Sequence, residues 1–433
     1  MSDAAPPLQP QPWGAPRPQV VLPGATPEAA AAVPPLPDQG QPVEFSSDGG
    51  AFLKKLVRGG LLELATFGFY RFWLATDIRR HLWSHTHVDR EGAEYTGTGR
   101  ELLIGFLFAM AILVPVYLAY FLIGIEAERV QAFASVPLGL FLLLFSQFAI
   151  YRARRYRLTR TVWRGVRFWM TGSAWKYAFI SFGWMIAVVL TLGLLYPWRE
   201  AALERYKMQH TRYGDLNGGF DASPAEFLRK GIWLWLCVAG PIVVIAGVLL
   251  AAWGEPGAGG GVLIGLSTFA LLVSPLLYPF FKALEWRWWA GGVHLGGTRM
   301  TCSLEGLSLL GLYLKNYVIV SIVTSVVALL AFAIGAVVLE ASGVGFKDGV
   351  RGFEALMKER LYLVIALAAI GYLFVAMAAG VVQRFFMQHE YWALIAGSLQ
   401  LKGIENLNDV ANRGELAGSL GEGLADGLDV GGF

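Results

Sequence analysis

Three pairs of an arginine and a histidine, separated by five positions, are the groups whose types and spacing point to chemistry. They are Arg80 with His85, Arg205 with His210, and Arg384 with His389. Guanidinium groups bind carboxylates and phosphates, and histidine titrates at about pH 6.5. Gathered around one cytoplasmic vestibule, the pairs would bind an anionic substrate or act as pH-sensitive gates. Alternatively, each pair marks a helix end, with arginine at the membrane surface and histidine at the cap.

Metal and catalytic chemistry have little support in the sequence. His81, His85 and His87 form a histidine cluster, and the first two have the spacing of metal ligands on one helix face. No cysteine lies near them, so we predict no metal site and no cofactor. Motifs of serine hydrolases, zinc proteases and phosphate-binding loops are absent. We therefore predict that the protein is not an enzyme.

Two of the pairs belong to a longer passage that occurs twice. Its shared residues begin at Thr66 and Gly68 and end at Glu101, and they recur 125 residues later, ending at Glu226. Duplication is common in transporter folds. A weaker echo around Arg384 indicates a third, divergent copy. The predicted repeat units are residues 43–151, 152–281 and 282–396.

The composition is that of a membrane protein. Hydrophobic residues make up 55% of the 433 residues and charged residues 15%, whereas soluble domains carry about 25% charged residues. A net charge of +3 gives no reason to expect nucleic-acid binding. Several apolar runs are long enough to cross a bilayer as helices. They lie near residues 102–123, 134–150, 231–253, 262–281, 317–339 and 361–383.

Two further apolar segments, 53–75 and 175–198, do not fit a simple crossing. The connections 151–174 and 199–230 are rich in arginine and lysine, which predicts that both lie in the cytoplasm. The segment between them is too short to cross twice. We therefore predict re-entrant half-helices or an interfacial helix. The expected hinge residues are Gly68, Gly183, Gly193 and Pro197.

These observations predict an all-α polytopic membrane protein with internal repeats, about six transmembrane helices, two re-entrant or interfacial segments and both termini in the cytoplasm. The alternative is a bundle of eight transmembrane helices. Residues 1–42 hold 12 of the 20 prolines and show no signal-peptide pattern, so we expect a disordered cytoplasmic tail rich in proline and alanine. Residues 397–433 are predicted to form a cytoplasmic amphipathic segment that docks on the protein's basic connections or, alternatively, on a partner.

Several motifs resemble those of a known bacterial family. Residues 190–198 read Leu-Thr-Leu-Gly-Leu-Leu-Tyr-Pro-Trp and are followed by Arg205, which resembles the signature of the YjgN-like inner-membrane proteins. Residues 65–73 are a degenerate version, and residues 418–426 resemble the end of that family's chains. The resemblance covers residues 43–430. It implies a polytopic protein of the bacterial inner membrane whose molecular function is not established.

The duplication, the re-entrant segments and the basic cytoplasmic face predict a transporter or channel for a small anionic solute. The alternative is a non-transporting scaffold or lipid-organising protein of the envelope. The expected partners are the bilayer itself and anionic lipid headgroups at a basic connection. The arginines expected to bind these headgroups are Arg152, Arg154, Arg155 and Arg157.

Overall fold

The computed structural model describes residues 40–129, 135–251, 260–341, 360–408, 410–414 and 416–428. The tail predicted over residues 1–42 therefore lies almost entirely outside the described residues. Within the described part, long helices dominate, and short strands separate them along the chain.

The described strands form one antiparallel sheet that closes on itself, which we call the strand ring. The eleven strands described have the order β3-β2-β1-β11-β10-β9-β8-β7-β6-β5-β4. The first strand pairs with the last, with Gln41 opposite Leu401, and Ala93 alone joins β3 to β4 at the two ends of this order. The bounds are β1 Gln41–Phe45, β2 Thr86–Val88, β3 Glu91–Gly92, β4 Glu94–Tyr95, β5 Thr161–Trp163, β6 Val166–Met170, β7 Thr211–Tyr213, β8 Leu216–Phe220, β9 Val293–Leu295, β10 Thr298–Cys302 and β11 Leu399–Lys402.

The strand ring corrects the predicted all-α class. Its strands have two to five residues, which is too short for alternating hydrophobicity to reveal them within polar connections. Tight turns join them at one edge. Arg164 and Gly165 both have positive φ, 50° and 73°, as a two-residue type I′ hairpin turn requires.

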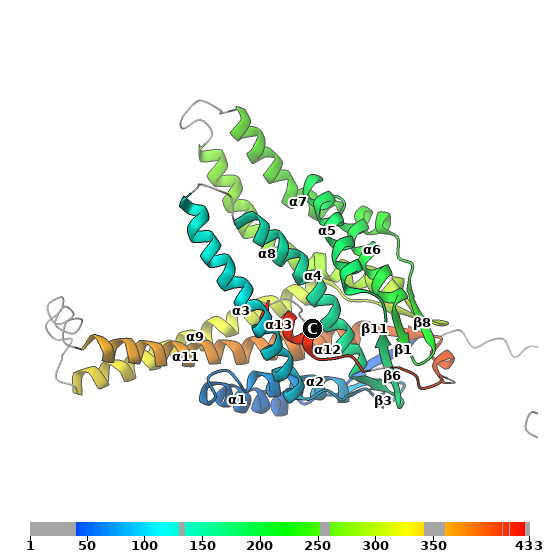
Figure 1. The fold of residues 1–433 in the computed structure, drawn as a ribbon, viewed down its shortest axis with the longest axis horizontal. Helices are drawn as coiled ribbons and strands as arrows, with labels where there is room; N and C mark the ends of the chain where they lie inside the picture. The colour runs from blue at the N-terminus through cyan, green and yellow to red at the C-terminus, as the bar shows by residue number, and fades with distance from the viewer. Residues whose placement is uncertain are drawn as a thin grey trace, which may run out of the picture. The chain divides into compact units, whose positions relative to one another are not determined.

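The described helices that precede the last strand form five hairpins, each inserted between two neighbouring strands. Ser46 N–H donates to His85 O (3.1 Å) at the base of the first hairpin, and Thr171 N–H donates to His210 O (2.9 Å) at the base of the third. Because successive strands run in opposite directions, every hairpin leaves from the same edge of the strand ring. Figure 1 shows the helices extending away from the strands. The helices are α1 Gly49–Ala65, α2 Arg71–Ser84, α3 Gly99–Arg129, α4 Ser135–Thr159, α5 Ala174–Leu190, α6 Tyr196–Gln209, α7 Pro224–Ala251, α8 Gly260–Gly292, α9 Gly306–Ala341, α11 Leu361–Arg384, the π-helix η3 Phe385–Glu390, and α12 Tyr391–Ser398.

Three of these hairpins are long, and the length and apolar composition of their helices indicate a membrane protein. Four stretches of the described helices are long and apolar enough to cross a bilayer: Gly99–Gly124, Pro224–Ile245, Gly306–Ala341 and Leu361–Ser398. They belong to the hairpins α3–α4, α7–α8 and α9–α11, which also contain the six stretches predicted to cross. The α9–α11 hairpin exposes apolar side chains such as Leu329 (68%) and Tyr372 (71%), as lipid-facing helices do. The number of crossings stays a prediction.

The other two hairpins, α1–α2 and α5–α6, are short and occupy the segments 53–75 and 175–198. Each segment holds part of a first helix, a turn and the start of a second helix. Since both ends of α5–α6 meet the strand ring, the connections before and after it lie on the same side of the helices, as the placement of basic residues predicts. The turn at each tip exposes apolar side chains, with Phe67 94% and Leu190 79% exposed.

The two turns share one geometry. Gly68 has φ 87° and Gly193 has φ 88°, a left-handed conformation that glycine adopts without strain. In the first turn, Thr66 Oγ1 donates to the carbonyl four residues earlier at 2.7 Å. Of the other predicted hinge residues, Gly183 lies inside the continuous helix α5, and Pro197 lies in the first turn of α6.

The C-terminal segment crosses the strand ring and returns to the helices. The short 3₁₀ helix η4, Ile404–Leu407, buries its two end residues against Trp163 and Tyr213 of the strands. Farther on, helix α13, Leu420–Gly427, packs between α3 and α4. The predicted amphipathic segment is therefore divided among α12, β11, η4 and α13.

Candidate functional site

The structure places the first two predicted Arg–His pairs at helix ends. His85 and His210 cap α2 and α6, and the Nδ1 atom of each lies 2.7 Å from the carbonyl oxygen four residues earlier. Arg80 donates from Nη2 to Gly97 O at 2.9 Å, and Arg205 is exposed. These contacts are those of the helix-end interpretation.

The third pair lies in different surroundings. Arg384 donates two hydrogen bonds to the carboxylate of Glu63 on α1, at 2.6 and 3.0 Å. His389 is 4% exposed, and its Nε2 lies 3.0 Å from Ser47 Oγ. His81 Nε2 lies 2.8 Å from the same hydroxyl. The structure therefore joins a residue of the third pair to the predicted histidine cluster, beside the start of α1.

His81 in this cluster is poorly suited to carry positive charge. Burial, followed by the cation of Lys55, lowers the pKa of His81 to about 4. Lys55 Nζ lies 3.4 Å from His81 Nδ1, and the rings of His81 and His85 are 4.1 Å apart. The described residues contain no group of three or more His, Cys, Asp or Glu side chains placed to hold a metal ion.

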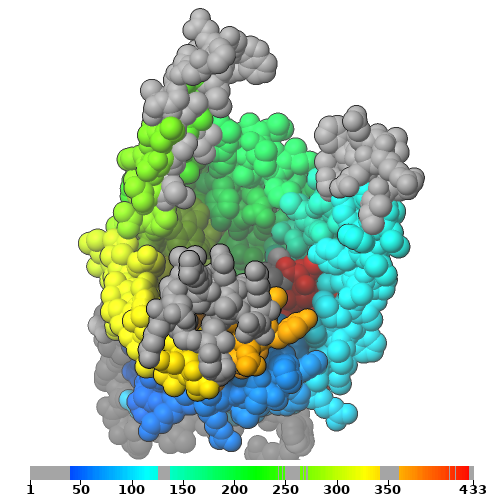
Figure 2. All heavy atoms as spheres, turned by 90° about the vertical axis from the view of Figure 1, so that its left-hand side faces the viewer, coloured from blue at the N-terminus to red at the C-terminus, as the bar shows by residue number. Residues whose placement is uncertain are grey.

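A separate cavity lies where α4, α6, α8, α9 and the η3–α12 segment meet. Its volume is about 610 Å³, within the range of small-molecule sites. Figure 2 shows a hollow between the hairpins, with α3 in cyan and α9 in yellow on opposite sides. Charged and aromatic side chains line the cavity, among them Arg154, Glu200, Glu204, Lys282, Glu285, Trp286, Trp289, Tyr313 and Tyr391.

Two carboxylates of this cavity are neutralised by lysines. Glu204 forms an ion pair with Lys207 on the same helix. Although burial opposes ionisation, Lys207 lowers the pKa of Glu204 below its ordinary value. Glu285 pairs with Lys282 at 2.6 Å and accepts a hydrogen bond from Tyr196 Oη at 2.8 Å. Neither carboxylate therefore adds an uncompensated charge.

Glu200 is the third carboxylate of the lining. Burial raises its pKa above the ordinary value, although the neighbouring Arg199 favours the charged form. Its ion pair with Arg199 is formed within α6. Glu200 therefore takes up a proton more readily than Glu204, whose pKa is lowered.

Arg154 is the cationic residue of the cavity lining that forms no ion pair among the described residues. Among the described residues, no carboxylate pairs with it and its Nε has no hydrogen-bond partner, while its Nη2 lies 3.5 Å from Met208 Sδ. Gln388 Oε1, also in the lining, has no hydrogen-bond partner among the described residues. A ligand in the cavity would thus lie beside a guanidinium group and an amide group.

The four arginines predicted to bind lipid headgroups lie on α4, which continues to Thr159. The basic connection is therefore partly helical. Arg154 faces the cavity, Arg157 lies 3.6 Å from the carboxylate of Glu422 on α13, and the backbone and Cβ of Arg152 pack against Gly421. Arg154 and Arg157 thus face other parts of the protein, and Arg152 packs against α13 through its backbone and Cβ.

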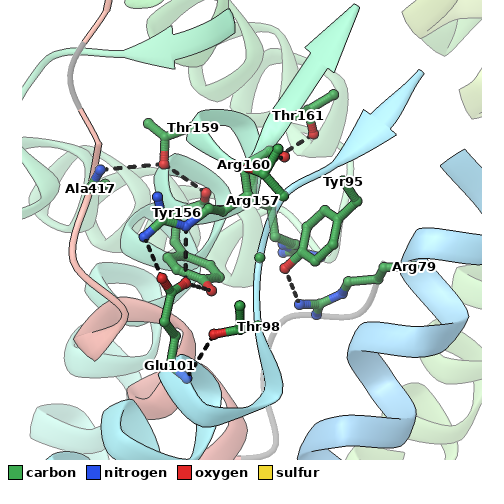
Figure 3. Close-up of polar contacts among 12 residues, drawn as sticks. Arg79, Tyr95, Thr98, Glu101, Tyr156, Arg157, Thr159, Arg160, Thr161 and Ala417 are labelled. Carbon is green, nitrogen blue, oxygen red and sulfur yellow. Dashed lines mark hydrogen bonds and ion pairs between the residues drawn. The ribbon is translucent and has the colours of Figure 1, made fainter.

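Helix α13 is held beside α4 by buried charge. Glu422 and Arg79 of α2 form an ion pair and are 8% and 9% exposed. Figure 3 shows the adjoining network, in which Arg160 donates to both carboxylate oxygens of Glu101, at 3.0 and 3.1 Å. Glu226, the predicted counterpart of Glu101, instead pairs with Lys230 within α7.

Sequence reasoning missed the cavity. Its lining comes from five elements that are far apart in the chain, and no motif joins them. One signal was available: Glu200 and Glu204 stand 125 residues after Ala75 and Arg79. This change in charge within the duplicated passage marks the α6 face that lines the cavity.

A bacterial family of unknown function, DUF898, matches residues 40–427. This match covers most of the chain and confirms the resemblance that the motifs indicate. No curated protein and no solved structure matches the chain.

Proposed function

The chain belongs to the bacterial DUF898 family of unknown function, and we propose that it is a membrane transport protein for a small organic anion. The observation that carries this proposal is the cavity of about 610 Å³ around Arg154. The strand ring would lie in the cytoplasm, with both termini, and the three long hairpins would cross the bacterial inner membrane six times.

The charge balance of the cavity favours an anion. Glu204 and Glu285 have lysine partners and Glu200 has Arg199, whereas Arg154, whose charge also favours ionised Glu204, forms no ion pair within 4 Å among the described residues. A carboxylate or phosphate ligand would complete its hydrogen bonds. Tryptophan and tyrosine side chains of the wall favour a ligand that also has an apolar body.

The position of the cavity favours transport over catalysis. It lies at the cytoplasmic base of the hairpins, where the short hairpin α5–α6 meets α4 and α8. The tips of the short hairpins expose apolar residues such as Phe67 and Leu190, which suits partial entry into the bilayer. A solute bound near Arg154 would thus stand between the strand ring and the membrane-embedded helices.

A lipid-organising role without transport is the second candidate. The observation that favours it is the exposed apolar surface of α9–α11, which includes Leu329 and Tyr372. Such a protein would order lipids around its hairpins and would need no ligand at Arg154. Ligand binding and flux therefore separate the two functions.

The test uses the full-length protein in nanodiscs and benzoate as the probe. Benzoate binding is followed by the fluorescence of the cavity tryptophans. Arg154→Gln removes the proposed anion contact, and Arg155→Gln removes the same charge from the next position of α4. Because a hydrogen bond to a charged group contributes about 1.5–3 kcal/mol, Arg154→Gln should weaken binding about tenfold or more.

Uptake of labelled benzoate into proteoliposomes provides the second measurement. Transport predicts uptake by the wild type and by Arg155→Gln, and its loss in Arg154→Gln. Binding and uptake that are equal in all three proteins, or absent from the wild type, would refute the proposal and favour the lipid-organising role.

A further inference from the structure

An apolar groove adjoins the charged cavity. It lies among α6, α7 and α8 and has a volume of about 350 Å³. Its walls are almost entirely aliphatic or aromatic, and they include Leu192, Pro197, Leu234, Val238, Leu277 and Phe281. Val238 is 38% exposed, so the groove is accessible from the lipid-facing side of α7.

The groove and the cavity follow one another along the seam between α6 and α8. On α6, Tyr196 lines the groove, and Glu200, one turn closer to the strand ring, lines the cavity. On α8, Phe281 lines the groove and Glu285 lines the cavity. Tyr278 lines both. On α6 the polar part therefore lies toward the strands and the apolar part toward the tip of α5–α6, whereas on α8 the two parts line adjacent faces of the helix, with Leu284 in the groove beside Glu285 in the cavity.

The boundary between the two parts is marked by a hydrogen bond. Tyr196 Oη donates to Glu285 Oε1 at 2.8 Å, with the ring on the groove side and the carboxylate on the cavity side. Polarity thus changes over the length of one side chain. A ligand that spans both parts must itself be amphipathic.

We propose that the transported anion is a single-chain amphiphile, with its anionic headgroup at Arg154 and its hydrocarbon chain in the groove. This inference rests on the proposed function and names its substrate class. The unpaired guanidinium group selects a negative headgroup, either carboxylate or phosphate. The apolar groove favours a ligand with a hydrocarbon chain, because each methylene group that leaves water stabilises the complex.

The experiment compares hexanoate with decanoate, which differ in chain length, and decanoate with decyl phosphate, which differ in headgroup. Affinities are measured by tryptophan fluorescence with the full-length protein in nanodiscs. Decanoate should bind at least tenfold more tightly than hexanoate, because each buried methylene contributes roughly a threefold to fourfold gain. The comparison with decyl phosphate shows which headgroup is preferred.

Two variants test whether the hydrocarbon chain of the ligand binds in the groove. Val238→Phe narrows the groove, and Leu236→Phe introduces the same aromatic side chain at an exposed position of α7 outside the groove lining. Val238→Phe should remove the advantage of decanoate while hexanoate binding stays unchanged, and Leu236→Phe should change neither. Gly231→Leu, which also fills the groove beside Leu284, provides a second variant if Val238→Phe does not fold.

The outcomes separate this inference from the proposed function. Anion binding that depends on Arg154 but not on chain length overturns the amphiphile and leaves the transport proposal standing. Long-chain binding that is unchanged in Arg154→Gln overturns the headgroup assignment. Loss of the decanoate advantage in Leu236→Phe as well as in Val238→Phe overturns the assignment of the groove.

Discussion

The two short hairpins have the same backbone geometry at their turns, but their second helices carry different buried charges and contact different parts of the protein. α1–α2 and α5–α6 lie 125 residues apart in the chain, and their turns have the same φ at Gly68 and Gly193, 87° and 88°. Arg79 on α2 pairs with Glu422 of α13, whereas Glu204 at the corresponding position of α6 pairs with Lys207 and lines the cavity. Arg79 and Glu204 carry opposite buried charges, and this difference accompanies the change from a helix that contacts the C-terminal segment to one that lines the cavity.

Removing the buried carboxylate of α13 should have the largest effect. Glu422→Ala leaves Arg79 and Arg157 without their shared partner. Because a buried cation without its partner is costly, the free energy of unfolding should fall by about 3–5 kcal/mol. Chemical denaturation in detergent measures this loss. Glu405→Ala, at an exposed position of η4, should change stability little, and an equally small effect of Glu422→Ala would break the proposed anchoring role of α1–α2.

The close contact of α13 with α3 gives a second test of the anchor. A Cβ atom at Gly423 would lie 2.0 Å from the backbone of Gly105. Gly423→Leu should therefore displace α13 and destabilise the protein by about 1–3 kcal/mol. Gly418→Leu is the matched control, since a Cβ there meets nothing within 4 Å. Limited proteolysis near residue 417 should increase in Gly423→Leu and not in the control.

Acid should weaken the first hairpin more than the second. The folded-state pKa of His81 is about 4, below the unfolded value of about 6.5, so the folded state binds fewer protons than the unfolded state between these values. Stability is therefore lost as the pH falls from about 6.5 toward 4. His81→Tyr, which introduces the residue found 125 positions later at Tyr206, should reduce the fall in Tm between pH 7 and pH 5. An unchanged pH dependence in this variant, with His294→Gln as control, would contradict this assignment.

The smallest expected effect lies in the second hairpin. Burial raises the pKa of Glu200, so the folded state holds its proton more tightly than the unfolded state. Stability from this group is present at low pH and is lost as the pH rises through the folded-state value. Glu200→Gln, which keeps the neutral shape, should be slightly more stable than the wild type at pH 8, and this difference should disappear below about pH 4.3, where the unfolded state also holds the proton, as thermal unfolding across this range would show.

Several features of this fold were predictable from the sequence. The duplicated turn around Gly68 and Gly193, and the common side of the connections before and after α5–α6, follow from glycine placement and from clustered arginines. The strand ring was not predictable, because its strands are very short and some, such as Glu94–Tyr95, are stabilised by a neighbour from a distant part of the chain. The cavity was missed for the same reason, since Arg154 and Gln388 meet only in the folded protein.

Hydrogen–deuterium exchange with and without benzoate tests most directly the claim that the second short hairpin, and not the first, faces the ligand. Peptides from α6, Tyr196–Gln209, should exchange more slowly when benzoate is bound, and peptides from α2, Arg71–Ser84, should not change. In Arg154→Gln the protection of α6 should disappear. Protection of α2 in place of α6, or no protection of either helix at saturating benzoate, would contradict the account.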